Sequence, residues 1–243
     1  MTLRKHIPNA ITAMNLLCGC IAVFFAFINP QISALFIVLA AIFDFFDGMV
    51  ARLLHVKSAI GKELDSLADI VSFGVAPGFI LFGLIDQSQE LQFFIPFENI
   101  APFIHQLNIL PFVAFAIPVF SGLRLAKFNV DTRQEEAFIG LPTPACALMI
   151  LSLPMMERYT PEIFYAFFSN TYVLLVLTVI FSFLLVAPLR LFSLKFKGFG
   201  WKNNEIRWAF LLVSLLLIIV LQFLAIPVIL LVYIILSIIF PKS

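Results

Sequence analysis

Four aspartates are the most unusual feature of this sequence, because they lie at the ends of two long apolar runs. One run carries Asp44 and Asp47 near its end, and the next carries Asp65 and Asp69 near its start. A charged side chain at the centre of a bilayer costs at least about 2.5 kcal/mol, so acidic residues in such runs indicate a functional site. Clustered carboxylates also repel one another and need a cation if all of them are to ionise.

The spacing of these aspartates predicts that they share one site. Residues three or four apart share a helix face, so Asp44 pairs with Asp47 and Asp65 pairs with Asp69. The short connection at 53–61 favours antiparallel neighbouring helices, with the two pairs facing each other. Carboxylate oxygens without nearby His or Cys suit hard cations such as Mg²⁺, Mn²⁺ or Ca²⁺. We expect two such cations, which would clamp a phosphoryl group in transfer.

Small and polar residues around the aspartates indicate room for a phosphorylated ligand. Gly48, Ala51 and Gly61 would let a bulky ligand approach the helix backbones. Arg52 offers a planar fork of donors for a phosphate. Ser58 lies in the connecting segment, where a polar head group can be held.

The composition is that of a membrane protein. The chain has 243 residues, of which 62% are apolar and 12% charged, whereas a soluble domain carries about 25% charged residues. The mean hydropathy is +1.08. The net charge of +1 and the lack of a dense basic face argue against nucleic acid as a partner. We expect one integral membrane domain over residues 1–243.

Eight apolar runs are long enough to approach the roughly 20 residues that a membrane helix needs. The predicted fold is therefore all-α, a polytopic membrane bundle of about eight transmembrane helices. The runs are 10–28, 31–53, 63–85, 109–128, 142–157, 168–190, 206–223 and 226–241.

The distribution of basic residues predicts the orientation. With eight spans and a cytoplasmic N-terminus, every Lys and Arg except Arg158 falls on the cytoplasmic side, as the positive-inside rule requires. Both termini and the aspartate cluster would then face the cytoplasm, and the protein would lie in the cytoplasmic (inner) membrane. An arrangement of six helices also places both termini in the cytoplasm, but only if two of the eight spans are removed together.

The segment from Asp44 to Asp69 reads D-x2-D-G-x2-A-R-x8-G-x3-D-x3-D. This pattern resembles the signature of the CDP-alcohol phosphatidyltransferases at every fixed position. The resemblance implies a core of at least six membrane helices, usually in a homodimer, and two Mg²⁺ or Mn²⁺ ions. It also implies a CDP-linked lipid as donor and an alcohol acceptor that displaces CMP.

The same resemblance assigns roles to individual residues. Asp44, Asp47 and Asp65 would bind metal, and Asp69 would be both a metal ligand and the catalytic base for the acceptor hydroxyl. The residues expected to bind the CDP-lipid are Asn9, Thr12, Asp44, Gly48, Ala51, Arg52, Ser58 and Gly61.

Three segments outside the signature, 8–19, 122–129 and 138–145, resemble the serine-accepting branch of the family, the phosphatidylserine synthases. The resemblance implies transfer of a phosphatidyl group from CDP-diacylglycerol to the hydroxyl of L-serine. Arg124 and Lys127 would pair with the serine carboxylate, and Asn129 and Thr143 would add neutral hydrogen bonds. The alternative without a role in binding is that Arg124 and Lys127 only anchor the cytoplasmic end of their helix, as the positive-inside rule describes.

Two alternatives remain open at this point. The first keeps the family but changes the acceptor to glycerol 3-phosphate or an inositol phosphate, with Arg124, Lys127 and Arg133 around the phosphate. The second is a divalent cation transporter that uses the four aspartates. A transporter predicts acidic groups on further helices, and the last three apolar runs carry none within their cores.

Overall fold

The computed structural model describes residues 3–56, 58–89, 109–130, 138–191 and 204–239, and over these ranges the chain is almost entirely helical. Over the described residues, each of the eight apolar runs lies mainly on a helix or on two closely connected helices, so the predicted all-α bundle is confirmed. The exception is a ladder of two antiparallel strands, β1 (Phe138–Ile139) and β2 (Arg190–Leu191), which the sequence did not predict.

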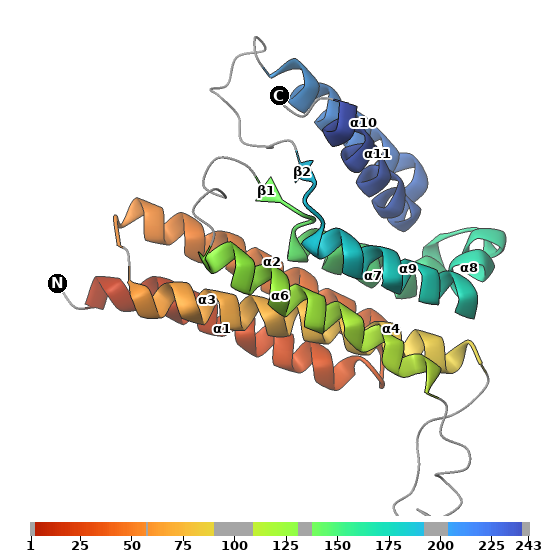
Figure 1. The fold of residues 1–243 in the computed structure, drawn as a ribbon, viewed down its shortest axis with the longest axis horizontal. Coiled ribbons are helices and arrows are strands. Elements are labelled where there is room, and N and C mark those ends of the chain that lie inside the picture. The colour runs from red at the N-terminus through yellow and green to blue at the C-terminus, as the bar shows by residue number, and fades with distance from the viewer. Residues whose placement is uncertain (1–2, 57, 90–108, 131–137, 192–203, 240–243) are drawn as a thin grey trace, which may run out of the picture.

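The first two helices, α1 (Leu3–Phe25) and α2 (Pro30–Leu53), form a closely packed hairpin (Figure 1). Asn29 caps α2, since its side-chain oxygen accepts a hydrogen bond of 3.0 Å from the amide of Ile32. Pro30 follows at the first helical position, where its missing N–H costs nothing. Local sequence therefore sets where α2 begins, and α2 carries the first aspartate pair.

The second aspartate pair lies on a longer helical run. This run joins α3 (Ala59–Ile70), a single π-helical turn η1 (Val71–Val75) and α4 (Ala76–Gln87). Ser58 caps α3 by accepting a hydrogen bond of 2.8 Å from the amide of Gly61. The backbones of α2 and α3 are not tightly packed; instead α1 packs against both, and α2 meets the run at η1 and α4. This spacing leaves room for side chains between the two aspartate pairs.

The next helices complete the bundle around α4. The turn η2 (Leu110–Phe115) leads into α6 (Ala116–Val130), which packs against α3, η1 and α9. Helix α7 (Thr143–Tyr159) packs against α2 and α4, and α8 (Glu162–Phe168) precedes α9 (Thr171–Val186). The interior is apolar around α4, where Ile80, Leu81 and Ile85 are buried.

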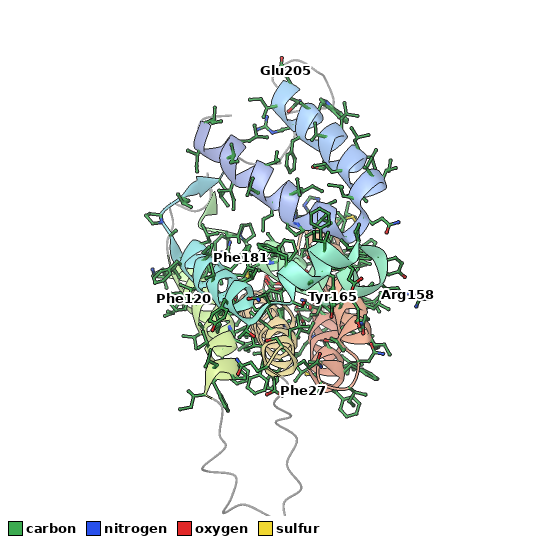
Figure 2. All side chains as sticks on the ribbon, turned by 90° about the vertical axis from the view of Figure 1, so that its right-hand side faces the viewer. Phe27, Phe120, Arg158, Tyr165, Phe181 and Glu205 are labelled. Atoms are coloured by element: carbon green, nitrogen blue, oxygen red, sulfur yellow. The ribbon has the colours of Figure 1, made fainter. Side chains whose placement is uncertain are left out.

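The last two helices, α10 (Glu205–Leu221) and α11 (Ala225–Ile239), fold back on each other through the turn η4 (Gln222–Leu224). The rings of Phe210 and Tyr233 lie 5.8 Å apart between them. This pair lies on one side of the bundle and contacts it through α7 and β2. Figure 2 shows Glu205 at the far end of the pair from the other helices.

Five of the described helical stretches are long and apolar enough to cross a membrane, and six are if the bent pair α8 and α9 counts as one span. Helix α7 has 17 residues and falls just below that length. The stretch Glu205–Ile239 counts as one span of 35 residues although it contains both α10 and α11. The protein is therefore an integral membrane protein with several spans.

Candidate functional site

Three of the four aspartates form one cluster. Carboxylate oxygens of Asp44, Asp47 and Asp65 all lie within 4.8 Å of one another, and they come from α2 and α3. Asp47 is buried, and the other two are half-buried. Such an all-oxygen set fits a hard divalent cation, because carboxylate oxygens are the ligands that Mg²⁺ and Mn²⁺ prefer.

Helix α1 supports this cluster from the side. Thr12 is buried, and its hydroxyl donates a hydrogen bond of 2.6 Å to Asp47 Oδ2. Pro8 O lies 3.0 Å from the same hydroxyl. The contact orients Asp47 toward the space between α2 and α3. Thr12 was predicted as a nucleotide-binding residue, and in this structure its hydroxyl points to a carboxylate of the cluster.

Asp69 lies one helical turn beyond Asp65 and is not one of the group of three, although its side chain is within hydrogen-bonding reach of Asp44. Its Oδ1 accepts a hydrogen bond of 3.4 Å from Asn15 Nδ2 of α1. Asp69 lines a cavity together with Asp44 and Asp65. The position leaves Asp69 next to the cluster and facing open space. Its predicted double role, as metal ligand and base, stays a prediction.

A first cavity of about 500 Å³ opens on one side of the aspartate cluster. Its wall includes Asp47 and Asp65, and six of the residues predicted to bind the CDP-lipid: Asn9, Thr12, Gly48, Ala51, Ser58 and Gly61. Two predicted residues do not belong to its described lining. Arg52 is exposed and folds back, and its Nε donates a hydrogen bond of 3.1 Å to Gly48 O. Asp44 faces the other side of the cluster.

A second cavity of about 330 Å³ opens on the other side of the cluster, with Asp44, Asp65 and Asp69 along one wall. Arg124 and Thr143 line the cavity as well; the former is 7% and the latter 1% exposed. Arg124 Nε and Thr143 Oγ1 are buried without a hydrogen-bond partner in the described part of the chain. Buried polar atoms are nearly always paired, so these two call for a ligand or water.

The remaining residues predicted for the acceptor differ in position. Asn129 lines the second cavity, and its side-chain amide donates a hydrogen bond of 2.9 Å to Ser66 Oγ. Lys127 is exposed, and the described lining of the cavity does not include it. The structure therefore brings Arg124, Asn129 and Thr143 together and leaves Lys127 apart from them.

Sequence analysis missed two residues at this site. Lys62 lines both cavities, and its ammonium group donates a hydrogen bond of 3.1 Å to the backbone oxygen of Asn129. Asn15 contacts Asp69 from α1. Both have a helical spacing that points to them, because Lys62 lies three residues before Asp65 and Asn15 lies three residues after Thr12.

The spans and the site define a class of integral membrane protein in which a carboxylate cluster separates two cavities. Residues 5–184 match the family model of the CDP-alcohol phosphatidyltransferases, and the chain belongs to this family. The protein is therefore a transferase of phospholipid synthesis. This assignment gives no support to the cation-transporter alternative.

Individual relatives share one name. The chain is 30% identical over 239 residues to a CDP-diacylglycerol–serine O-phosphatidyltransferase of Helicobacter pylori strain 26695, covering 86% of this chain and 93% of the relative. It is 34% identical over 154 residues to the Bacillus subtilis strain 168 protein of that name, covering 61% and 75%. The Methanocaldococcus jannaschii protein of that name is 34% identical over 145 residues, covering 60% and 58%.

Proposed function

We propose that this protein transfers the phosphatidyl group of CDP-diacylglycerol to the hydroxyl of L-serine and releases CMP. The observation that carries the proposal is the position of the aspartate cluster between two cavities. One cavity is lined by small residues, and the other contains a buried arginine. The family membership supports the donor, and the names of the relatives support the acceptor.

The first cavity suits the CDP part of the donor. Gly48 and Gly61 keep its walls open, and Ser58 and Asn9 supply polar atoms around Gly61. Bound Mg²⁺ or Mn²⁺ at the aspartate cluster would supply charge stabilisation for the pyrophosphate and for the leaving CMP. Arg52 lies at the edge of this cavity, where a change of rotamer would bring its guanidinium to a phosphate.

The second cavity suits the acceptor. The unpaired Nε of Arg124 would donate to the serine carboxylate, and the hydroxyl of Thr143 would add a second polar contact. Asp69 would accept the proton of the serine hydroxyl as that oxygen bonds to the phosphorus. The bond from phosphorus to the CMP oxygen breaks in the same displacement. No covalent intermediate with the protein is needed.

Product formation by the purified protein tests this proposal. CDP-diacylglycerol and Mg²⁺ or Mn²⁺ are supplied with L-serine, glycerol 3-phosphate, inositol 3-phosphate or no acceptor. We expect CMP and phosphatidylserine to form only when L-serine is the acceptor. If CMP forms with a different acceptor and not with serine, serine is not the acceptor, but the assignment of the active site stands. If no CMP forms with any acceptor, the proposed reaction is refuted.

The choice of serine over a phosphorylated acceptor also rests on the second cavity. Arg124 and Lys62 are the basic residues in its described lining. A phosphate dianion favours a denser basic pocket than a carboxylate does. Arg133, considered for such a pocket, lies outside the described residues.

A further inference from the structure

We infer that Asn15 is a positioning residue, which holds the Asp69 carboxylate in the orientation needed to accept the proton of the acceptor. This inference rests on the proposed function. Asn15 is fully buried in α1, and its side-chain amide donates to Asp69 Oδ1 at 3.4 Å. No role follows for Asn15 from the aspartate signature, because it lies on a different helix.

The side-chain amide of Asn15 has a defined orientation. Its NH₂ group faces Asp69, and the reversed orientation would place the amide oxygen against a carboxylate oxygen. Asn15 Oδ1 is itself buried without a hydrogen-bond partner among the described residues. The contact to Asp69 is therefore the interaction that decides which way this amide points.

The backbone of Asn15 is also held in place. Ser72 Oγ, in the π-helical turn η1, donates a hydrogen bond of 3.0 Å to Asn15 O. One turn further along α1, Gly19 allows close approach, since an added Cβ there would collide with Ser72. The π-helical turn begins at Val71, two residues after Asp69, and such turns are often found at functional sites. Ser72, Asn15 and Asp69 thus connect α1 firmly to the helix that carries the proposed base.

An orienting contact is needed here because like charges surround Asp69. Asp44 and Asp65 lie along the same cavity wall and repel the Asp69 carboxylate. The amide contacts one oxygen of Asp69, and the Asp69 side chain lines the second cavity. A neutral amide does this without adding a positive charge to the site. A displacement of about 1 Å in a catalytic group costs on the order of 100-fold in rate.

The decisive variant is Asn15→Leu, which keeps the branched shape of the side chain, with a somewhat larger volume, and removes the donor. We expect kcat to fall about 10- to 100-fold, with the KM values for CDP-diacylglycerol and for serine changed less than about twofold. Asn15→Gln retains an amide donor and should recover part of that loss. An unchanged kcat in Asn15→Leu overturns the inference. So does a loss of kcat with equal increases in both KM values, because that pattern indicates general damage to the site.

A second pair of variants keeps the inference testable if Asn15→Leu does not fold. Ser72→Ala removes the hydrogen bond to the backbone of Asn15, and Ser33→Ala is its matched control. Ser33 is also buried, and its hydroxyl donates a hydrogen bond of 2.7 Å to the backbone oxygen of Ala22 in the α1–α2 hairpin. We expect kcat to fall several-fold in Ser72→Ala and to stay unchanged in Ser33→Ala. Equal kcat in the two variants overturns the proposed support of Asp69 through Asn15.

These measurements distinguish a failure of the inference about Asn15 from a failure of the proposed function. If wild type accepts another alcohol, the same variants are measured with that alcohol, and the prediction for kcat is unchanged. If Asp69→Asn remains active, the proposed base is wrong and the inference falls with it. If Asp69→Asn is inactive while Asn15→Leu has wild-type kcat, the base stands and only the role of Asn15 is refuted.

Discussion

At the scale of single residues, the site separates carboxylates by their surroundings. Asp44, Asp47 and Asp65 approach one another; Asp47 lines the first cavity, Asp44 lines the second, and Asp65 lines both. Asp69 is one turn away and has an amide partner. The same residue type can therefore serve two purposes, with the group of three suited to cations and Asp69 suited to proton transfer.

Asp69→Asn tests the proposed base. The amide keeps the shape of the side chain and cannot accept a proton, so we expect turnover to fall by at least about 100-fold. CDP binding, measured by the thermal shift of the purified protein, should be largely retained. Wild-type turnover in this variant would refute the role of Asp69 as base.

Arg124→Ala tests the acceptor cavity, with Lys127→Ala as its matched control. Hydrogen bonds to a charged partner are worth about 1.5–3 kcal/mol, so we expect the serine KM to rise at least about 10-fold when Arg124 is lost. The KM for CDP-diacylglycerol should change much less. Lys127 is exposed outside the described cavity lining, and its loss should leave both values near wild type. Equal effects on both substrates would remove Arg124 from the acceptor site.

At the scale of elements, helix α1 holds the site together. It packs against both α2 and α3, and Thr12 and Asn15 on α1 contact one aspartate from each of the other two helices. At Gly61 the start of α3 lies close to Asn9 of α1, since an added Cβ there would lie 2.9 Å from Asn9 Oδ1. Both residues line the first cavity, so this close approach of α1 and α3 shapes its wall.

Gly61→Ala tests this close approach. An added Cβ would lie 2.8 Å from Ser58 Oγ and 2.9 Å from Asn9 Oδ1, so both side chains must move. We expect a several-fold rise in the KM for CDP-diacylglycerol and a loss of about 1–3 kcal/mol in stability from overpacking. Gly83→Ala is the control, because its added Cβ meets nothing closer than 3.7 Å. Similar kinetics for the two variants would contradict the argument.

At the scale of the whole molecule, the protein is an apolar bundle that positions a polar site between its first helices. The apolar faces of its spans suit lipid, and the described helices supply five or six candidate spans. The orientation predicted from the basic residues and the predicted homodimer are not tested by this single chain. Both stay predictions.

Cysteine labelling tests the orientation. In a background without Cys18, Cys20 and Cys146, a cysteine is placed at His55 or at Tyr159, which are both exposed. His55 lies between α2 and α3, and Tyr159 ends α7. We expect a membrane-impermeant thiol reagent to label Tyr159→Cys in intact cells and His55→Cys only in inverted vesicles. The opposite pattern would reverse the predicted topology.

Metal removal tests the cation site of the whole enzyme. Chelation should abolish turnover, and added Mg²⁺ or Mn²⁺ should restore it, because clustered carboxylates need a cation to bind a negatively charged donor. The cation should also raise the melting temperature, since it binds the folded state preferentially. Asp44→Asn should weaken that thermal shift. Full activity after exhaustive chelation would refute a metal-dependent reaction.

The sequence alone determined the fold class, the helical runs and the aspartate cluster. Apolar runs of membrane length and carboxylates at helical spacing are local properties, and both can be counted along the chain. The two helices were expected to be antiparallel neighbours with facing aspartate pairs. Aspartates from both helices do meet, but the backbones of α2 and α3 are not tightly packed, because local spacing does not report how far apart two helices lie.

Only the tertiary structure decided which residues meet across helices. It placed Asn15 against Asp69 and Lys62 between the cavities, and it left Lys127 outside the second cavity's described lining. It also set the neighbours of the glycines, since Gly61 lies against Asn9 of α1 and Gly19 lies against Ser72 of η1. The physical reason is that contacts between α1, α3 and α6 depend on helix rotation and spacing, which follow from the packing of the entire bundle.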